Sequence, residues 1–402
     1  MAEILTIKEK MRVLYITSKP IFPTIDGGCV AMERFLSSLL FAGIDVKHLQ
    51  IETEKHPFNR DVYPKEIQEK TQPEAVQINT RVTITSAFLH LFKSGSYNVD
   101  RFNDPAMLSL ILATLKEQSF DAIIFESLFT SSYIKPIKSV FEGRLYLRTH
   151  NVEFDLWEGY AADAKGIKHW YLKKLARDLK NYELKLLNSV NGILSISSDD
   201  SAIFKKNGIT TPTHNVPVAV TIPKILHNYE HNEPYHIGSM DWIPNQEAVH
   251  KLVMLMPEIR KQIADTTMYI AGSNAKDYVT SDENLGIHVQ GFVEHIISFG
   301  SEHGILVSPI QSGSGIRIKI LEAMSVGIPV LTTTIGAQGI RHHETNCLLI
   351  ADSDADFVAE TVRLIMDQAL RQEIGQNAID YIRKNHNIEA VSQKISEILR
   401  TT

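Results

Sequence analysis

Cysteine is scarce in this sequence of 402 residues, where only Cys29 and Cys347 occur. Two cysteines cannot build a disulfide framework, and this scarcity fits a reducing cytosol. No apolar run approaches the roughly 20 residues that a transmembrane helix requires. The N-terminal residues carry scattered charges and lack the apolar segment of a signal peptide. We therefore expect a cytoplasmic protein.

Positive charge is not in excess, since 41 Lys and Arg residues oppose 47 Asp and Glu residues and the formal net charge is -6. This balance gives no overall attraction to nucleic acid, so an anionic ligand needs a local cluster of cations. No His or Cys residues have the spacing of a metal site, and we expect no metal. Asp352 and Asp354 form an Asp-x-Asp pattern, but a helical pattern starts near Ala355, and helix capping explains the pattern.

The length and the alternation of patterns predict two domains. Apolar runs alternate with amphipathic stretches, and the runs are apolar on both faces, as in parallel sheets covered by helices. These runs are residues 11–17, 120–126, 143–149, 191–197, 234–239, 266–272, 287–293, 304–310, 328–334 and 346–352. We expect an α/β fold with two doubly wound Rossmann-like domains, 1–215 and 216–384. The boundary falls in the Pro- and Asn-rich segment 207–234.

The segment from Ser312 to Leu331, SGSGIRIKILEAMSVGIPVL, carries the strongest functional signal. Its first residues follow the predicted strand 304–310 and precede a helical pattern that begins near Ile316. Glycines at such a position let backbone N–H groups reach a ligand, and the helix N-terminus adds partial positive charge. We therefore predict that Ser314, Gly315 and Ile316 bind an anion.

Three charged side chains follow this loop. Arg317 and Lys319 fall in the first helical turn, where cations oppose the helix dipole by about 0.3–1 kcal/mol each. A bound diphosphate reverses that penalty because it gives both cations a common partner; solvated surface charges are the alternative. Glu322 can accept two hydroxyl hydrogen bonds from a ribose diol, or can pair with a nearby cation on the helix surface.

Two common nucleotide motifs are absent. A dinucleotide fingerprint requires glycine where Ile318 stands, and a P-loop requires a Gly-Lys pair, which the sequence lacks. Hydride transfer and nucleoside triphosphate hydrolysis therefore lose most of their support.

Gly27 and Gly28 lie between the first predicted strand and a helical pattern at 29–42, where they form either a second anion site or a simple tight turn. Cys29 beside them is expected to be a small buried helix residue rather than a nucleophile. Gly238 ends the first strand of the second domain, and its backbone can face the same diphosphate as the loop after residue 310.

His150 directly follows the strand 143–149, so its imidazole either hydrogen-bonds a substrate group or closes the strand structurally. Asn151 and Glu153 are polar neighbours that favour a functional loop. The basic stretch 168–188 carries a leucine stripe, which indicates either a helix that packs on the core or docking on an anionic membrane surface. Residues 52–105 show few strand or helix signals and predict long functional loops.

Together these motifs resemble the group 1, or family 4, glycosyltransferases of the GT-B fold. The most specific part is the 304–340 segment with KILEAMSVGIPVLTT. The segments ITSKPIFPTIDGGCVAMERF, RTHNVEFDLW and GSMDWIPN extend the resemblance over nearly the whole chain. The last two together resemble a branch that acts in bacterial surface-polysaccharide synthesis.

The resemblance implies that the two domains face a cleft and that a C-terminal helix, residues 385–402, crosses back onto the first domain. It also implies a retaining, metal-independent hexosyl transfer from a nucleotide-diphosphate sugar to a glycan or lipid-linked acceptor. Such an enzyme needs no cofactor and does not bind nucleic acid. It works in the cytoplasm, with peripheral contact at the inner face of the membrane as a further expectation.

The resemblance also assigns roles to residues of the first domain. Gly27 and Gly28 would meet the donor phosphate, and His150 would touch the transferred sugar. Asn151 and Glu153 would lie on the acceptor side. The segment 93–104 would help to shape that side as well.

In the second domain, the resemblance implies that Arg317 and Lys319 neutralise the diphosphate leaving group and that Glu322 holds the ribose. The backbone near Phe292 and Val293 would meet the base. The catalytic set is therefore His150, Arg317, Lys319 and Glu322. The donor-binding set adds Gly27, Gly28, Gly238, Phe292, Val293, Ser314, Gly315 and Ile316.

One residue departs from the family pattern. Ser314 stands where many members carry the first of two glutamates with seven residues between them. GSMDWIPN also lacks the Arg and Lys that many members carry there, so phosphate neutralisation falls on Arg317 and Lys319. Two alternatives stay open: a GT-B-fold epimerase acting on nucleotide sugars, and a non-catalytic partner subunit.

Overall fold

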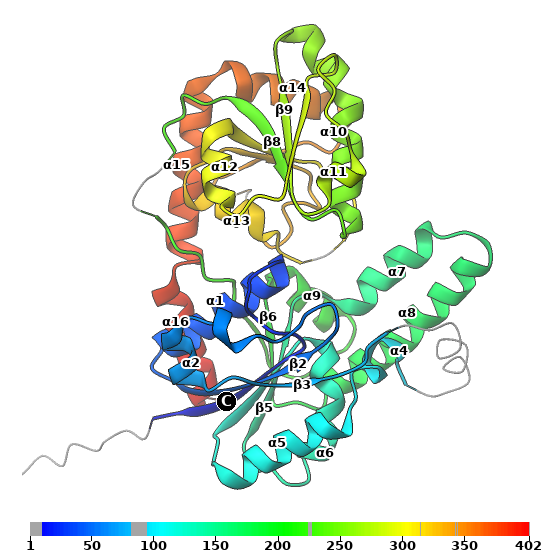
Figure 1. Ribbon diagram of the computed structural model, residues 1–402, viewed down its shortest axis with the longest axis vertical. Helices are drawn as coiled ribbons and strands as arrows, with labels where there is room; N and C mark the ends of the chain where they lie inside the picture. Colours follow the sequence, from blue (N-terminus) through cyan, green and yellow to red (C-terminus); the bar gives the residue numbers. More distant parts are fainter. Residues whose placement is uncertain are drawn as a thin grey trace, which may run out of the picture. The chain divides into compact units, whose positions relative to one another are not determined.

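The computed structural model describes residues 10–81, 95–223, 227–313, 315–341, 343 and 345–401, except for the side chain of Asp163. The chain forms two compact units, each of which is described by itself. Unit 1 comprises Met1–Val216 and Val391–Thr402, and unit 2 comprises Pro217–Ala390. Each unit is a parallel sheet with helices packed on it (Figure 1).

Unit 1 has a sheet with the strand order β3-β2-β1-β4-β5-β6-β7. Its strands are β1 (Arg12–Thr17), β2 (Asp45–Glu52), β3 (Glu74–Gln77), β4 (Ala122–Glu126), β5 (Arg144–Thr149), β6 (Gly192–Ser195) and β7 (Thr213–Asn215). Its α-helices are α1 (Gly27–Phe41), α2 (Lys65–Thr71), α4 (Tyr97–Asp100), α5 (Pro105–Glu117), α6 (Ile134–Ile137), α7 (Glu153–Asp163), α8 (Gly166–Leu187), α9 (Ser198–Lys206) and most of α16 (Ile388–Thr401). The described residues of unit 1 also form the 3-10 turns η1 (Arg60–Val62) and η2 (Leu128–Tyr133).

Unit 2 has a sheet with the strand order β10-β9-β8-β11-β12-β13. Its strands are β8 (Glu233–Ile237), β9 (Met268–Ala271), β10 (Ile287–Gly291), β11 (Gly304–Ser308), β12 (Val330–Thr332) and β13 (Leu349–Ile350). Its helices are α10 (Ile243–Gln262), α11 (Ala275–Tyr278), α12 (Ile296–His303), α13 (Ile318–Ser325), α14 (Asp354–Met366) and α15 (Gln368–Asn385).

The central strands confirm the predicted pattern of apolar residues on both faces. β4 and β11 are buried at every position, because helices cover both faces of a parallel sheet. All strand pairs of both sheets are parallel. The carboxyl ends of neighbouring strands therefore share one edge, which is where ligands of such sheets bind.

Strand β2 was not predicted, because no strand was expected between residues 29–42 and 120–126. Its sequence, DVKHLQIE, interleaves polar residues with apolar ones, yet its interior is buried. The Lys47 ammonium is satisfied because it donates to the backbone O of Gln72 at 2.7 Å and to Oε1 of Glu74. The expected loop 52–105 likewise contains α2, β3 and α4 among its described residues.

Helix boundaries also differ by a few residues from the predicted ones. α13 begins at Ile318 rather than near Ile316, and Arg317 is its N-cap residue. α10 begins at Ile243 rather than near Gln246. Gly43 has a φ of +73° after the end of α1, as expected for a residue that ends a helix.

The C-terminal helix belongs to unit 1 from Val391 onward, as the resemblance implied. The Arg144 guanidinium on β5 donates to the backbone O of Leu399 at 2.5 Å. Val391 and Leu399 are buried, so α16 covers the sheet of unit 1 with one apolar face. No helix among the described residues has both the length and the apolar character to span a bilayer.

Candidate functional site

The backbone conformation of the loop between β11 and α13 in unit 2 requires glycine. Gly313 and Gly315 have φ values of +90° and +81°, a backbone region that residues with a Cβ rarely adopt. A Cβ atom at Gly313 would lie 3.2 Å from Cγ of Pro244 and 3.3 Å from Cζ2 of Trp242. The bare loop therefore packs closely against the start of α10.

Arg317 fixes the shape of this loop from its end. Its residue is 4% exposed, and its guanidinium donates to the backbone O of Gly315 and, at 3.5 Å, to that of Ser312. The guanidinium carbon also lies 5.3 Å from the ring centroid of Trp242, which is a cation–π contact. The alternative of a solvated surface charge is therefore wrong for Arg317.

Lys319 turns inward from the first turn of α13 to the end of β8. Its ammonium donates to the backbone O of Ile237 at 2.9 Å, to Oδ1 of Asn245 at 2.9 Å and to Nε2 of His236 at 3.2 Å. Since Nδ1 of His236 lies 2.9 Å from the carbonyl oxygen of Val307, that nitrogen carries the proton and Nε2 accepts. The three N–H groups of the ammonium thus meet three neutral acceptors.

These neutral contacts do not balance the positive charge of Lys319, a half-buried residue at the start of α13. Burial, followed by the positive charge of Arg317, lowers the pKa of Lys319 well below its ordinary value. Burial and then the charge of Lys319 likewise lower the pKa of His236, so its imidazole is neutral. The three neutral acceptors do not compensate the positive charge of Lys319, whereas an anion bound at this loop would do so.

Gly238 and Glu322 are two further predicted residues of unit 2. A Cβ atom at Gly238 would lie 2.4 Å from Nδ2 of Asn245, so glycine makes room for the amide that holds Lys319. Asn245 also donates to the backbone O of Ser239 at 2.9 Å. Glu322 is half-buried on α13, and its negative charge adds to burial in raising the pKa of Tyr235.

The predicted residues of unit 2 thus come together at the carboxyl ends of β8 and β11. Arg317 and Lys319 lie beside Gly315 and the backbone that leads from Ile237 to Gly238. Ile316 lies between Gly315 and Arg317 and is half-buried. The side chains that position the lysine, His236 and Asn245, were not predicted.

The remaining residues of the predicted donor set lie elsewhere or are not described. Phe292 and Val293 follow β10 at the same edge of the sheet, two strands away from β8. Phe292 is 69% exposed. Ser314 lies outside the described residues.

The Asp-x-Asp pattern at 352–354 is structural, as predicted. Ser353 is the N-cap residue of α14 and accepts the N–H of Asp356. Asp352 accepts from the backbone N of Thr334 at 2.8 Å and from its hydroxyl at 2.7 Å. Within the described part of the chain, no three His, Cys, Asp or Glu side chains gather as a metal ion would require.

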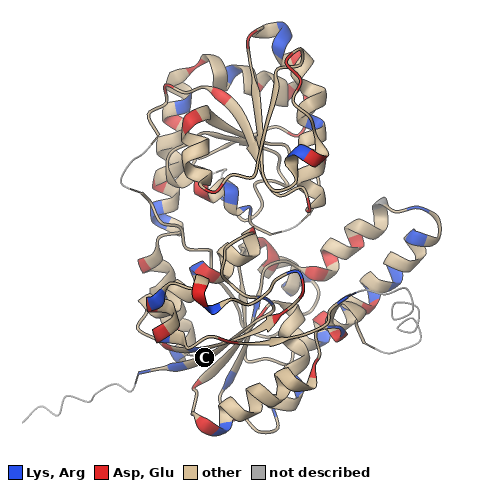
Figure 2. Ribbon diagram, in the orientation of Figure 1, with Lys and Arg blue, Asp and Glu red and all other residues tan. Residues whose placement is uncertain are grey.

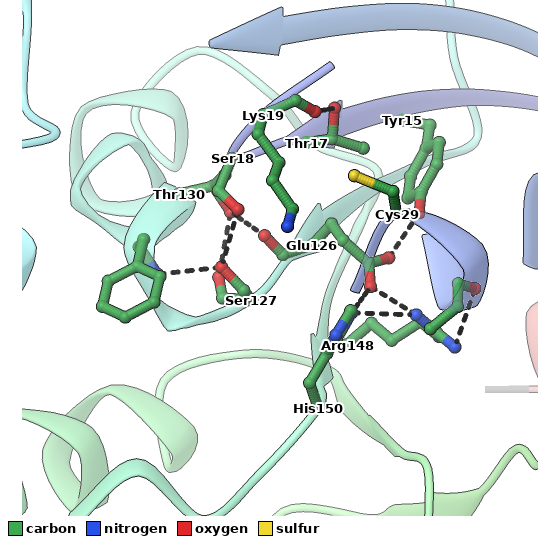
Figure 3. Close-up of polar contacts among 12 residues, drawn as sticks. Tyr15, Thr17, Ser18, Lys19, Cys29, Glu126, Ser127, Thr130, Arg148 and His150 are labelled. Carbon is green, nitrogen blue, oxygen red and sulfur yellow. Dashed lines mark hydrogen bonds and ion pairs between the residues drawn. The ribbon is translucent and has the colours of Figure 1, made fainter. Parts of the chain in front are cut away.

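Unit 1 contributes a second polar cluster at the carboxyl ends of its strands (Figure 3). Glu126 ends β4 and pairs in register with Arg148 on β5. Oε1 of Glu126 accepts from Nη1 of Arg148 and from Nε2 of His150, and Oε2 accepts from the Tyr15 hydroxyl at 2.5 Å. His150 thus lies at the open end of a chain of polar groups that begins inside the sheet.

Glu126 and Arg148 are both completely buried. Burial alone would raise the pKa of Glu126, but the charge of Arg148 and the contacts with His150 outweigh it, so the pKa is lowered and the carboxylate is charged. The Arg148 guanidinium carbon lies 4.4 Å from the ring centroid of Phe35. The side chain of His150 is 18% exposed, so only the histidine can meet a ligand.

The Gly27-Gly28 segment is the first turn of α1, and its N-terminus already carries a carboxylate. Asp26 is the N-cap residue and accepts the N–H of Cys29 at 2.8 Å. The Lys19 ammonium donates to both Asp26 oxygens at 2.7 and 2.6 Å. A Cβ atom at Gly28 would lie 3.1 Å from that ammonium. Burial raises the pKa of Cys29 to about 11, which confirms a buried thiol rather than a nucleophile.

Asn151 is half-buried after β5, whereas Glu153 is the first residue of α7 and is buried. The expectation that Glu153 lies on a loop is therefore wrong, and its place on the acceptor side stays a prediction. Burial raises the pKa of Glu153 to about 7, although a hydrogen bond with Asn151 partly opposes this shift. The buried carboxylate of Glu183 accepts the N–H groups of Glu153 at 3.3 Å and Phe154 at 2.9 Å, so it caps α7.

Residues 234–367 match the family model described as "Glycosyl transferases group 1". A Klebsiella pneumoniae protein, described as "Uncharacterized 44.6 kDa protein in cps region", is 24% identical over 318 residues, which are 73% of this chain and 80% of that protein.

Solved structures resemble nearly the whole chain, and two of them illustrate this similarity. Sucrose-phosphate synthase from Thermosynechococcus elongatus has a TM-score of 0.73 at 13% identity and covers 97% of this chain and 98% of its own. The Anabaena protein HepE, solved in complex with UDP-glucose, has a TM-score of 0.66 at 13% identity and covers 98% of this chain and 100% of its own. These similarities confirm the predicted fold class of two Rossmann-like domains.

Proposed function

We propose that this chain, whose residues 234–367 match the family model of the group 1 glycosyltransferases, transfers a sugar from a nucleotide-diphosphate donor to a glycan or lipid-linked acceptor. The name of the Klebsiella relative refers to a cps region, which supports a role in cell-surface polysaccharide synthesis. HepE binds UDP-glucose, which supports a nucleotide-sugar donor. We further propose that a hexosyl group is transferred with retention of configuration.

The observation that carries this proposal is the environment of Lys319. Its ammonium is held by three neutral acceptors, and burial together with Arg317 makes its charge costly. These acceptors satisfy the N–H groups of the ammonium, but they bring no negative charge to balance it. A diphosphate at the adjacent loop supplies the missing negative charge.

In the proposed reaction, negative charge develops on the diphosphate as the bond to the sugar breaks. Lys319, Arg317 and the N–H groups at the start of α13 stabilise that charge, and they require no metal to do so. One such group in place before the reaction is worth about 3–4 kcal/mol of barrier. Glu322, one turn further along α13, accepts the hydroxyl groups of the ribose.

His150 is the group that we propose for contact with the transferred sugar. Its Nε2 is bound to the Glu126 carboxylate, which fixes the orientation of the ring. Glu126 is a positioning residue, because it is completely buried and acts through His150.

The test is donor turnover by Lys319→Ala and Glu322→Ala, with Lys261→Ala as the matched control. Lys261 is an exposed lysine of the same unit that pairs with Glu258 on α10. Lys319→Ala should lower turnover about 100-fold or more, while the control keeps the wild-type rate. Wild-type turnover by both site variants would refute the proposed site.

Two further experiments distinguish a glycosyltransferase from an epimerase and from a non-catalytic partner subunit. An epimerase would alter the donor sugar when no acceptor is present, which product analysis after incubation with donor alone detects. A non-catalytic partner subunit would bind no nucleotide, so calorimetry with uridine and guanosine diphosphates would show no heat of binding.

A further inference from the structure

Helices α7 and α8 form a hairpin that extends away from the sheet of unit 1 (Figure 1). The turn between them comprises Ala164 and Lys165, followed by Gly166 with a φ of +62°. The inner face of α8 carries the predicted leucine stripe, and Leu175 and Leu179 on it are buried. The stripe is therefore part of the core, which confirms the core-facing alternative and removes the stripe as a membrane-docking surface.

The tip of the hairpin exposes two large apolar side chains. Ile167 is 88% exposed and Trp170 is 59% exposed. Because they are three residues apart in the first turn of α8, they lie on the same side of the helix. Exposing them to water is unfavourable, and tryptophan in particular is enriched where water meets lipid.

The same segment concentrates positive charge. Residues 160–178 contain five Lys or Arg residues and two acidic residues, Asp163 and Asp178, so their net charge is +5 − 2 = +3 in a chain of net charge -6. Lys174 and Arg177 face Asp178. Lys and Arg recur along the outer part of the hairpin (Figure 2).

Three exposed lysines remain at the tip, Lys165, Lys168 and Lys173. Lys165 is the N-cap residue of α8, no side chain caps that end, and its first turn has no acidic residue. Cations are unfavourable at this end of a helix. An external anionic surface would offset that cost, because it would meet the lysines and the terminal N–H groups together.

We propose that the hairpin tip, defined as Lys165, Ile167, Lys168, Trp170 and Lys173, docks on an anionic lipid bilayer. Ile167 and Trp170 enter the headgroup region, and the three lysines bind lipid phosphates. Docking by a protein tip of this kind keeps a glycosyltransferase beside a lipid-linked acceptor. The inference goes beyond the proposed function, and its test needs no turnover.

The test is co-sedimentation with vesicles of phosphatidylcholine alone or of phosphatidylcholine and phosphatidylglycerol in equal parts. The wild-type protein should bind only the anionic vesicles, and salt should weaken that binding. Each lysine near such a surface is worth about 1 kcal/mol, or about fivefold in affinity. The double variant Lys165→Glu/Lys168→Glu should therefore bind at least about 25-fold more weakly.

Loss of the two apolar side chains in Ile167→Ser/Trp170→Ser should also reduce binding. Matched controls in unit 1 are Lys116→Glu, an exposed lysine of α5, and Val140→Ser, which is 61% exposed. Circular dichroism of each variant checks that it is folded. The proposal is overturned if the wild-type protein does not bind anionic vesicles or if the tip variants bind like the controls. It is also overturned if the tip variants convert a wild-type oligomer to monomer without changing vesicle binding.

Discussion

Replacement of Lys319 by methionine separates the catalytic from the structural contribution of the site. Methionine keeps an unbranched side chain of similar size and removes the ammonium group. The backbone O of Ile237, Oδ1 of Asn245 and Nε2 of His236 each lose one donor at 2.9, 2.9 and 3.2 Å. The same change also removes the charge of a half-buried residue.

The two effects on stability oppose each other. A buried acceptor without a donor costs about 1–3 kcal/mol, and removing the ammonium of this half-buried residue returns part of its desolvation cost. The catalytic effect has no such compensation, because the diphosphate loses a cation worth about 3–4 kcal/mol of barrier. We therefore expect Lys319→Met to fold with a small change in the free energy of unfolding and to lose about 100–1,000-fold in turnover.

The pH dependence of stability gives an independent measurement. The pKa of Lys319 is lowered in the folded protein, whereas in the unfolded chain it is near 10.4. Between these two values the unfolded chain holds a proton that the folded chain has released. Wild-type stability should therefore rise with pH across this window, by up to about 1.4 kcal/mol per pH unit. Methionine does not titrate, so the variant should lack this contribution.

The assay is urea unfolding of both proteins at several pH values between neutrality and the ordinary lysine pKa. The difference between their free energies of unfolding should increase in favour of the wild type as the pH rises. Saturating uridine or guanosine diphosphate should diminish this trend, because a bound anion keeps Lys319 protonated. Identical pH slopes for the two proteins, or near wild-type turnover by Lys319→Met, would refute the reasoning.

Three other predictions follow from the structure. Glu126→Gln should lower turnover about tenfold or more and alter the pH profile of turnover. Glu126→Asp should restore part of the activity. An unchanged pH profile would exclude a positioning role of Glu126 through His150. Gly238→Ala should displace the Asn245 amide, which lies 2.4 Å from the added Cβ, and cost about 1–3 kcal/mol in urea unfolding, together with weaker diphosphate binding in calorimetry. Burial raises the pKa of Glu153 to about 7, so the folded protein holds an extra proton between pH 4.3 and 7 and loses stability as the pH rises through that range. Thermal unfolding of Glu153→Gln should lack this contribution of Glu153 to the pH dependence. An unchanged pH trend in the variant would contradict the prediction.

The strands that the sequence analysis found and the one that it missed differ in the location of their polar partners. β4 and β11 are apolar at their centres, so a local pattern is enough to predict them. β2 carries Lys47 inside its buried interior, and the partners that satisfy this ammonium lie 25 and 27 residues further along the chain. A local window of sequence cannot contain such partners.

The same reason separates the predicted from the missed site residues. Arg317 and Lys319 could be predicted because the glycine loop, the cations and the helix start are consecutive in sequence. Glu126 ends an ordinary buried strand, and its importance depends on Arg148 and His150, which are 22 and 24 residues away. The interpretation of Glu153 as a loop residue was wrong because the buried carboxylate of Glu183 caps the helix that begins there.

The sequence by itself determined the class of fold, the division into two Rossmann-like parts and the cationic loop before α13. These features depend on the order of residues along a few turns or strands, where chain neighbours are also neighbours in space. Only the tertiary structure decided that Lys319 turns inward to His236 and Asn245 and that Glu126 holds His150. Parallel pairing places strands that are distant in the chain side by side, and hydrogen bonds across that edge set the charge and direction of each side chain.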